Sequence, residues 1–199
     1  MEAIKNRMLA TKLFALGIFG VSLVSHHVYL DDSIIDLVLE GLGYILLGTA
    51  AFGRTWASAY IAGKKNQLLV TDGPYSAVRN PLYFFSFLGF LGAGLAFESI
   101  VLASLFGMVF FITHWPAILR EEQKLIELFG HSYARYRNRV PRFFPNLRLL
   151  EHPHSVVLFP AIFSKALLEA SLIAFVFLIA HIVEWAHVHS YLPVALRLF

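Results

Sequence analysis

The chain has 199 residues, of which 58% are hydrophobic and only 15% are charged, and its mean hydropathy is +0.66. A soluble domain of this length cannot bury so much apolar surface, so the composition indicates a membrane protein and excludes a soluble globular enzyme. Because the chain contains no cysteine, disulfide bonds, iron–sulfur clusters, cysteine nucleophiles and cysteine zinc sites are also excluded.

Five apolar runs approach the roughly 20 residues that one membrane-spanning helix requires. In chain order they are Leu13–Leu30, Ile34–Phe52, Pro81–Phe97, Ile100–Trp115 and Ala166–Trp185. The first run is too long for a secretory signal peptide and does not end in a small-residue cleavage site. We therefore predict an all-α integral membrane protein with about five transmembrane helices.

The basic residues are distributed unevenly among the loops. Fifteen of the sixteen lysines and arginines lie before the first run, between the second and third, or between the fourth and fifth, and only Arg197 lies elsewhere. The positive-inside rule places these basic loops in the cytoplasm, which predicts a cytoplasmic N-terminus and an outside C-terminus. Topology and anionic head groups explain the net charge of +3, so no nucleic-acid partner is expected.

The first cytoplasmic stretch, Gly53–Asn80, is expected to continue as a helix on the membrane surface to about Ala62. It then becomes irregular, with an extended segment and a turn. Pro81 suits the first turn of the helix that follows. The start of a helix at Pro81 does not explain three nearby residues: Tyr75, Arg79 and Tyr83.

The second cytoplasmic stretch, Pro116–Lys165, begins with an amphipathic helical pattern that Gly130 is expected to end. A second helix carrying Tyr133 and Tyr136 is expected to follow, up to Pro141. The simplest interpretation is a pair of helices lying on the bilayer, with arginines that reach lipid phosphates.

Two segments of these stretches resemble the isoprenylcysteine carboxyl methyltransferase and phospholipid methyltransferase superfamily. They are LLVTDGPYSAVRNPLY, residues 68–83, and EEQKLIELFGHSYARYRNRVPRFFP, residues 121–145. The family pattern is Leu-Val-x-x-Gly-x-Tyr followed by Arg-His/Asn-Pro-x-Tyr in the first segment, and Glu-Glu, Phe-Gly, Tyr, Tyr and Val-Pro in the second. The resemblance implies a single membrane methyltransferase-like domain over residues 1–199, with its core motifs at 53–145.

The resemblance also implies S-adenosylmethionine as the cofactor, held without a Rossmann fold between the loop before the central helical hairpin and the helix after it. Cofactor contact is implied for Gln67, Leu68, Leu69, Val70, Tyr75, Asn80, Pro81, Leu82, Tyr83 and Glu121. A sulfonium cation with a zwitterionic tail and a flat purine needs aromatic faces, a carboxylate and free backbone groups, which these residue types offer.

Three residues of the matching segments are candidate catalytic residues: Arg79, Glu122 and Arg142. If the methyl acceptor is an amine, one proton leaves it, and Glu122, His114 or His131 would accept that proton. If the acceptor is a carboxylate, no base is needed.

The chain departs from the prenylcysteine enzymes at two positions. Asn80 replaces a histidine, but asparagine occurs there in related phospholipid and bacterial members. Ala117 stands where those enzymes place an arginine that reads the substrate, which puts a prenylcysteine substrate in doubt. Arg120 or Arg142 would have to take over that role.

The expected function is methyl transfer from S-adenosylmethionine to a lipophilic acceptor with a carboxylate or amine head group at the cytoplasmic face. The acceptor would enter from the bilayer between the third and fourth spans and the last helix. The alternative is a small membrane scaffold or transporter subunit that binds lipid or a partner through its basic helices. A sterol-type reductase would require a longer nicotinamide-binding region. The sequence predicts no oligomeric state.

Polar residues inside the predicted spans have simpler interpretations. Asp36 and Glu40 are expected at a solvated or packing position in the outer half of the second span, and Glu169 is expected to pair with Lys165. One group near the end of the last span has ligand types that suit a metal: His181, Glu184 and His187. Scattered interfacial histidines are commoner than metal sites, so no metal site is predicted.

Overall fold

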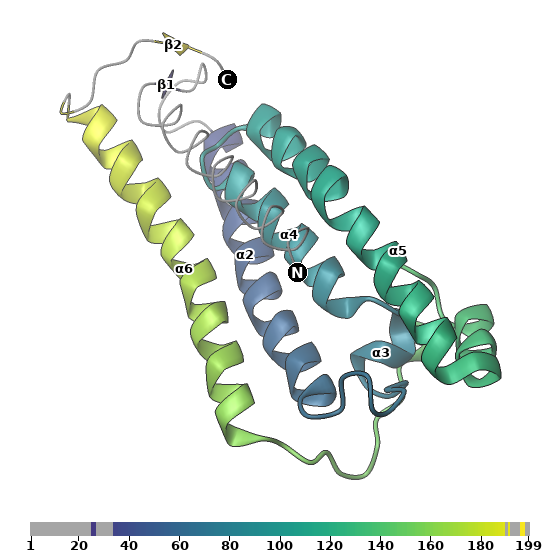
Figure 1. Ribbon diagram of the computed structural model, residues 1–199. Coiled ribbons are helices and arrows are strands. Elements are labelled where there is room, and N and C mark those ends of the chain that lie inside the picture. Colours follow the sequence, from purple (N-terminus) through teal and green to yellow (C-terminus); the bar gives the residue numbers. More distant parts are fainter. Residues whose placement is uncertain (1–24, 27–33, 190, 192–195, 198–199) are drawn as a thin grey trace, which may run out of the picture. The chain divides into compact units, whose positions relative to one another are not determined.

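The computed structural model describes residues 25–26, 34–189, 191 and 196–197. Its elements are β1 (Ser25–His26), α2 (Ile34–Ile61), α3 (Pro74–Ala77), α4 (Pro81–Leu95), α5 (Ile100–Arg139), the short 3-10 helix η1 (Leu147–Leu149), α6 (Pro160–Val188) and β2 (Leu196–Arg197), as Figure 1 shows. The two strands pair in parallel. All other regular structure in the described residues is helical, so the all-α prediction is confirmed as to a mostly helical fold, whereas the two short strands were not predicted.

Four of the five predicted spans correspond to helices α2, α4, α5 and α6. The predicted span Leu13–Leu30 lies outside the described residues, except for Ser25 and His26 in β1. By length and apolar composition, Leu37–Ile61 and Ile100–Arg139 are candidate membrane spans, whereas α4 is apolar but shorter. The number of spans and the orientation of the chain stay predictions.

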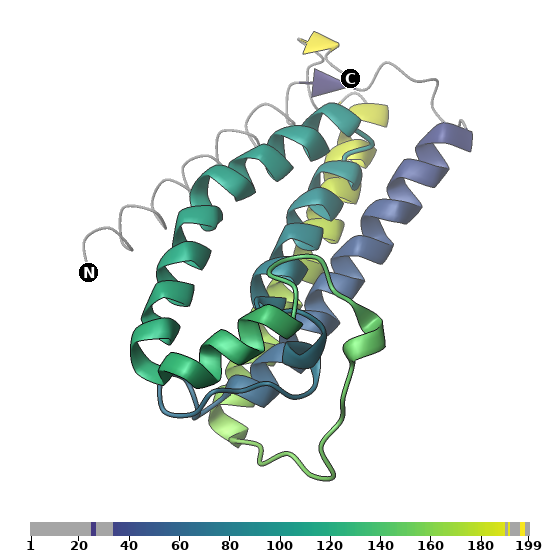
Figure 2. The same ribbon diagram turned by 90° about the vertical axis from the view of Figure 1, so that its right-hand side faces the viewer.

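Helix α5 contains both the fourth predicted span and the predicted amphipathic helix, and it passes through Pro116 without ending there. It bends sharply at Gly130, where φ is 47° and ψ is −121°, as Figure 2 shows. Glycine adopts this conformation readily because it has no Cβ. The prediction that the amphipathic helix ends at Gly130 is therefore confirmed, and 131–139 runs in a new direction.

The chain divides into two compact units. The first contains the described residues up to Leu46, together with Phe90–Thr113 and the described residues from Phe175 onward. The second contains Leu47–Gly89 and His114–Ala174. Every residue that the sequence proposed as a cofactor or catalytic residue lies in the second unit.

The core of the second unit is aromatic. The ring of the buried Phe143 lies 5.5 Å from that of Phe87, 6.0 Å from that of Phe84 and 6.1 Å from that of Trp115, measured between centroids. Aromatic pairs at these distances add stabilisation to that of the buried area alone. This cluster attaches the segment after α5 to α4 and to the middle of α5.

Within the first unit, α4 and α5 approach each other closely at Gly94. A Cβ built on Gly94 would lie 2.3 Å from the backbone of Ala103, so an alanine there forces the helices apart. We expect Gly94→Ala to lower the free energy of unfolding by about 1–3 kcal/mol, measured by thermal unfolding in detergent micelles. Gly41→Ala is the matched control, because a Cβ on Gly41 meets no atom within 4 Å. Equal stability of the two variants would contradict the prediction.

Candidate functional site

Main-chain hydrogen bonds join the loop before α4 to the segment after α5. The N–H of Arg79 donates to the carbonyl of Pro141 at 2.9 Å, and the N–H of Asn146 donates to the carbonyl of Ala77 at 2.9 Å. Partners 62 and 69 residues apart are thereby held together. The two stretches that carry the sequence motifs therefore fold against each other.

Glu151 fixes the start of α3. The N–H of Gly73 donates to the carbonyl of Glu151 at 2.8 Å, and the N–H of Glu151 donates to the hydroxyl of Ser76 at 2.8 Å. Gly73 has a φ of 58°, and a Cβ on it would lie 2.2 Å from the ring of Tyr60. This position therefore requires glycine for both conformation and space.

A buried ionic network surrounds Glu122, whose side chain is only 6% exposed. Its Oε1 lies 3.3 Å from Nη1 of Arg79 and accepts a hydrogen bond from Nδ2 of Asn80 at 3.0 Å. Its Oε2 accepts from Nε of Arg142 at 3.1 Å and lies 3.0 Å from Nη2 of the same residue. The three predicted catalytic residues and Asn80 thus meet, and both oxygens of the carboxylate are engaged.

Further contacts hold Arg142 in place. Its carbonyl accepts a hydrogen bond from Nδ2 of Asn80 at 3.1 Å, and its guanidinium lies 5.7 Å from the ring centre of Trp115. An arginine over an indole gains a favourable cation–π interaction. Asn80 therefore links the start of α4 to the carboxylate of Glu122 and to the backbone of Arg142.

Three buried tyrosines, Tyr75, Tyr133 and Tyr136, lie near Arg79 and this network. The hydroxyl of Tyr136 donates to the carbonyl of Tyr75 at 2.7 Å. Within the described residues, the hydroxyls of Tyr75 and Tyr133 and Nε of Arg79 are buried without a hydrogen-bond partner, whereas Nη1 of Arg79 makes no hydrogen bond but lies 3.3 Å from Oε1 of Glu122. Buried polar atoms normally find partners, so a group of unpaired ones suggests a place for a polar ligand.

The neighbouring Glu121 lies in a more open environment. Its Oε1 is 3.5 Å from Nζ of Lys65, and the side chains of Lys65 and Glu121 are 65% and 45% exposed. Burial raises the pKa of the Tyr75 phenol, and the charges of Tyr136 and Glu121 act in the same direction. Glu121 therefore lies within electrostatic range of Tyr75.

The other predicted cofactor residues are spread along the two segments. The ring of Tyr83 lies 6.1 Å from that of His114, and Leu69 packs against the cluster formed by Tyr133, Tyr136 and Val140. Four residues differ in exposure: Gln67 and Leu68 are exposed, and Val70 and Leu82 are half-buried. Pro81 is fully buried at the start of α4.

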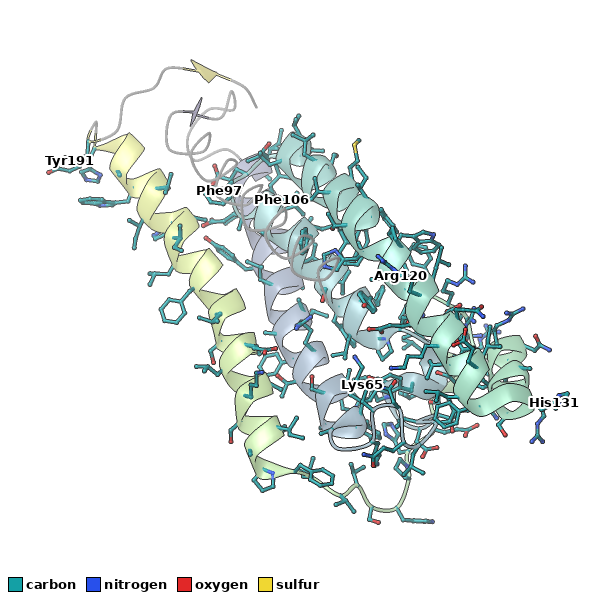
Figure 3. All side chains as sticks on the ribbon, in the orientation of Figure 1. Lys65, Phe97, Phe106, Arg120, His131 and Tyr191 are labelled. Carbon is teal, nitrogen blue, oxygen red and sulfur yellow. The ribbon has the colours of Figure 1, made fainter. Side chains whose placement is uncertain are left out.

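Two further residues from the sequence predictions face away from the ionic network. His131 is exposed at the bend of α5 and points away from the neighbouring helices, as Figure 3 shows. Nε of Arg120 donates to the carbonyl of Pro116 at 3.0 Å, on an exposed part of α5. Ala117 is buried.

Tyr133 and Trp115 belong to this site but were not predicted for it. The sequence pattern predicts Tyr133 in a helix on the bilayer surface, yet its side chain is completely buried. The repeated spacing of Tyr133, Tyr136 and Val140 is the signal for a buried helix face. No local pattern marked Trp115, because its partner Arg142 is distant in the sequence.

The polar residues of the first unit form a separate contact. Glu40 accepts a hydrogen bond from the hydroxyl of Tyr44, and its Oε1 lies 3.8 Å from Nδ1 of His181. The side chains of Glu184 and His187 lie outside the described residues. Among the described residues, no group of three potential metal ligands occurs.

Comparison with known proteins relates the chain to membrane methyltransferases and to metal-resistance proteins. The family model for phospholipid methyltransferase matches residues 34–132. The nickel-cobalt-cadmium resistance protein NccN of Alcaligenes xylosoxydans is 32% identical over 173 residues, which cover 87% of this chain and 81% of that protein.

Two other relatives match over shorter regions. The cobalt-zinc-cadmium resistance protein CzcN of Cupriavidus metallidurans is 36% identical over 143 residues, which cover 72% of this chain and 63% of that protein. The protein-S-isoprenylcysteine O-methyltransferase of Schizosaccharomyces pombe is 35% identical over 114 residues, which cover 53% of this chain and 48% of that enzyme. No solved structure matches the chain.

Proposed function

The chain belongs to the superfamily of phospholipid methyltransferases and isoprenylcysteine carboxyl methyltransferases, and from this premise we propose that it transfers a methyl group from S-adenosylmethionine to a lipophilic acceptor at the cytoplasmic membrane face. The apolar helices agree with a membrane location. The methyl donor, the cytoplasmic face and the class of acceptor are the parts that this proposal adds.

The observation that carries the proposal is the group of buried donors without a hydrogen-bond partner: the hydroxyls of Tyr75 and Tyr133 and Nε of Arg79, whose Nη1 is paired with Glu122. Leaving such atoms without a partner costs about 1–3 kcal/mol each. S-adenosylmethionine carries a carboxylate and two ribose hydroxyls, which accept hydrogen bonds from donors of these kinds. We propose that Arg79 binds the carboxylate and that the two phenols bind the carboxylate or the ribose.

Glu121 supplies a negative charge within electrostatic range of Tyr75. We propose that its carboxylate binds the ammonium group of the cofactor, exchanging its exposed partner Lys65 for it. The exchange is inexpensive because exposed ion pairs contribute little. Tyr83, Asn80 and the irregular backbone of 67–70 would complete the cofactor site.

When bound, S-adenosylmethionine supplies a methyl group activated by a sulfonium. The protein has then to align the acceptor and exclude water. Because two guanidinium groups and an amide engage Glu122, we propose that this residue positions Arg79 and Arg142 and does not take a proton. If the acceptor is an amine, His114 beside Tyr83 is better placed to accept the proton.

Calorimetric titration of the detergent-purified protein with S-adenosylmethionine tests the cofactor site. We expect the affinity to fall about tenfold in Glu121→Gln and in Tyr83→Ala, since each loses one contact with a charged ligand. Glu127→Gln is the matched control, because Glu127 lies on an exposed part of the same helix and accepts a hydrogen bond from Gln123. Equal binding heats in the wild type and all three variants would contradict the proposed cofactor site.

The identity of the acceptor requires a separate measurement. Incubating the protein with radiolabelled S-adenosylmethionine and total membrane lipid would show which lipid fraction takes up the label. If the protein does not bind S-adenosylmethionine and no lipid fraction takes up the label, the alternative is favoured. That alternative is a membrane scaffold or transporter subunit that binds lipid or a partner.

The proposal includes a multi-pass topology with about five spans, an inside N-terminus and an outside C-terminus. The distribution of lysine and arginine supports it. Because the chain has no cysteine, single cysteines introduced into its loops and labelled from either side of the membrane would test it. Two relatives are named for metal resistance, but the described residues offer no reason to include metal binding.

A further inference from the structure

Helix α2 carries one arginine within its candidate membrane span. Arg54 belongs to α2, in the span Leu37–Ile61, and its side chain is 29% exposed. Its Nη1 donates to the hydroxyl of Ser86 on α4. A charged residue in a membrane helix is costly and usually serves a function, so this position calls for an explanation.

The carboxylate closest to Arg54 neutralises it incompletely. Oε2 of Glu169 on α6 lies 3.7 Å from Nη2 of Arg54, which is longer than the 3.0 Å between Arg142 and Glu122. The side chain of Glu169 is also 51% exposed. The expected pairing of Glu169 with Lys165 is replaced by this long contact between two helices. Because long and partly exposed ion pairs contribute little, another anion can replace Glu169 at little cost.

Arg54 also lies close to the proposed reaction centre. Ser86 follows Tyr83 by three residues in α4, so the two side chains share a helix face and differ in height by about 4.5 Å. Helices α2 and α4 are in close contact here, because a Cβ on Gly53 would lie 2.2 Å from the ring of Phe85. The guanidinium is therefore held about one helical turn from Tyr83.

We propose that Arg54 binds the anionic head group of the lipophilic acceptor and positions it for methyl transfer. This inference rests on the proposed function. The head group would be a carboxylate or a phosphate, since both offer two oxygens to one guanidinium. Ala117 supplies no cation, Arg120 lies on an exposed part of α5, and Glu122 occupies Arg142.

The chemistry of an anionic acceptor agrees with the rest of the site. The acceptor oxygen forms the new bond to the methyl carbon while the electron pair of the carbon–sulfur bond stays on sulfur. No proton leaves the acceptor, so no base is required. Such an acceptor is compatible with a Glu122 that two arginines hold. Glu169 would move aside when the anion arrives.

Quenching of tryptophan fluorescence by 9,10-dibromostearate in a neutral maltoside detergent tests this inference without any cofactor. Trp56 follows Arg54 by two residues in α2 and lies near the ring of Phe85, so it reports on a chain bound here. The uncharged methyl ester of the same acid is the control probe. An alkyl phosphate with the same brominated chain distinguishes the two head groups.

We expect the acid or the phosphate to bind more tightly than the ester. Arg54→Gln should weaken binding of the anionic probe about tenfold, whereas Glu169→Gln should leave it unchanged or strengthen it. Arg135→Gln, which removes an exposed arginine of α5, should have no effect. If Arg54→Gln does not fold, Arg54→Lys should still prefer the anion to the ester.

Two results would overturn the inference. Equal affinity for the acid, the phosphate and the ester would show that no anion site exists. An equal loss of affinity for the anionic probe in Arg54→Gln and in Glu169→Gln would show that the Arg54–Glu169 pair only joins the two helices. Failure of the proposed function gives a different result, because a chain that binds the anionic probe but not S-adenosylmethionine lacks the cofactor site alone.

Discussion

Replacing Glu122 with glutamine is expected to lower the free energy of unfolding by about 3 kcal/mol, because removing one partner of a buried ion pair leaves the other charge uncompensated. The side chain of Arg79 is only 9% exposed and cannot be hydrated in the folded protein. Arg142 would lose its charged partner, because the amide of glutamine keeps only one acceptor oxygen and no negative charge. Unfolding of the detergent-solubilised protein by heat or denaturant measures the effect.

The adjacent carboxylate provides the matched control. Glu121→Gln is expected to change the stability by less than about 0.5 kcal/mol, since its pair with Lys65 is exposed. Combining Glu122→Leu with Arg79→Leu should recover part of the stability that Glu122→Leu loses, because no unpaired buried charge remains in Arg79. Equal stability of the two glutamine variants would contradict the buried network.

The ends of the helices were largely predictable because local chemistry determines them. α4 begins at Pro81, which has no N–H to donate, and α5 bends at Gly130, where φ is positive. α2 ends at Ile61, just before Gly63 with its φ of 69°. In each case one residue type has a conformation that its neighbours do not share, so the sequence shows the position directly.

The composition of the ionic network was only partly predictable. The resemblance indicates Arg79, Glu122 and Arg142, but their contacts join residues 43 and 20 positions apart, which no local pattern reveals. One signal was available for Glu122. It follows the buried Ile118 by four residues, so both lie on the same face of α5, whereas Glu121 is rotated by about 100° and reaches solvent.

The continuation of α5 through Pro116 shows where sequence rules fall short. A proline inside a helix removes one hydrogen bond, which favours a boundary there. The helix nevertheless continues, because Ala117 and Ile118 are buried and their packing outweighs the local cost. The partners of Trp115, including Phe143 after the bend, depend on that continuation.

Replacing Tyr75 or Tyr133 with phenylalanine is expected to change stability and cofactor binding in opposite directions. Without ligand, each hydroxyl is buried and unpaired in the described structure, so its removal should leave the free energy of unfolding unchanged or raise it by up to about 1 kcal/mol. In calorimetric titrations the affinity for S-adenosylmethionine should fall about tenfold per hydroxyl. Burial raises the pKa of Tyr75, so this phenol keeps its proton at neutral pH.

Tyr136→Phe provides the contrast, because the hydroxyl of Tyr136 already donates to the carbonyl of Tyr75. Its removal leaves that carbonyl without this partner and should lower the free energy of unfolding by about 1–2 kcal/mol. A ligand cannot replace a hydrogen bond made inside the protein. Added S-adenosylmethionine should therefore not remove the difference in free energy of unfolding between Tyr136→Phe and wild type. If all three variants lost stability alike and bound the cofactor normally, the unpaired hydroxyls would serve packing alone, and the cofactor site would have to lie elsewhere.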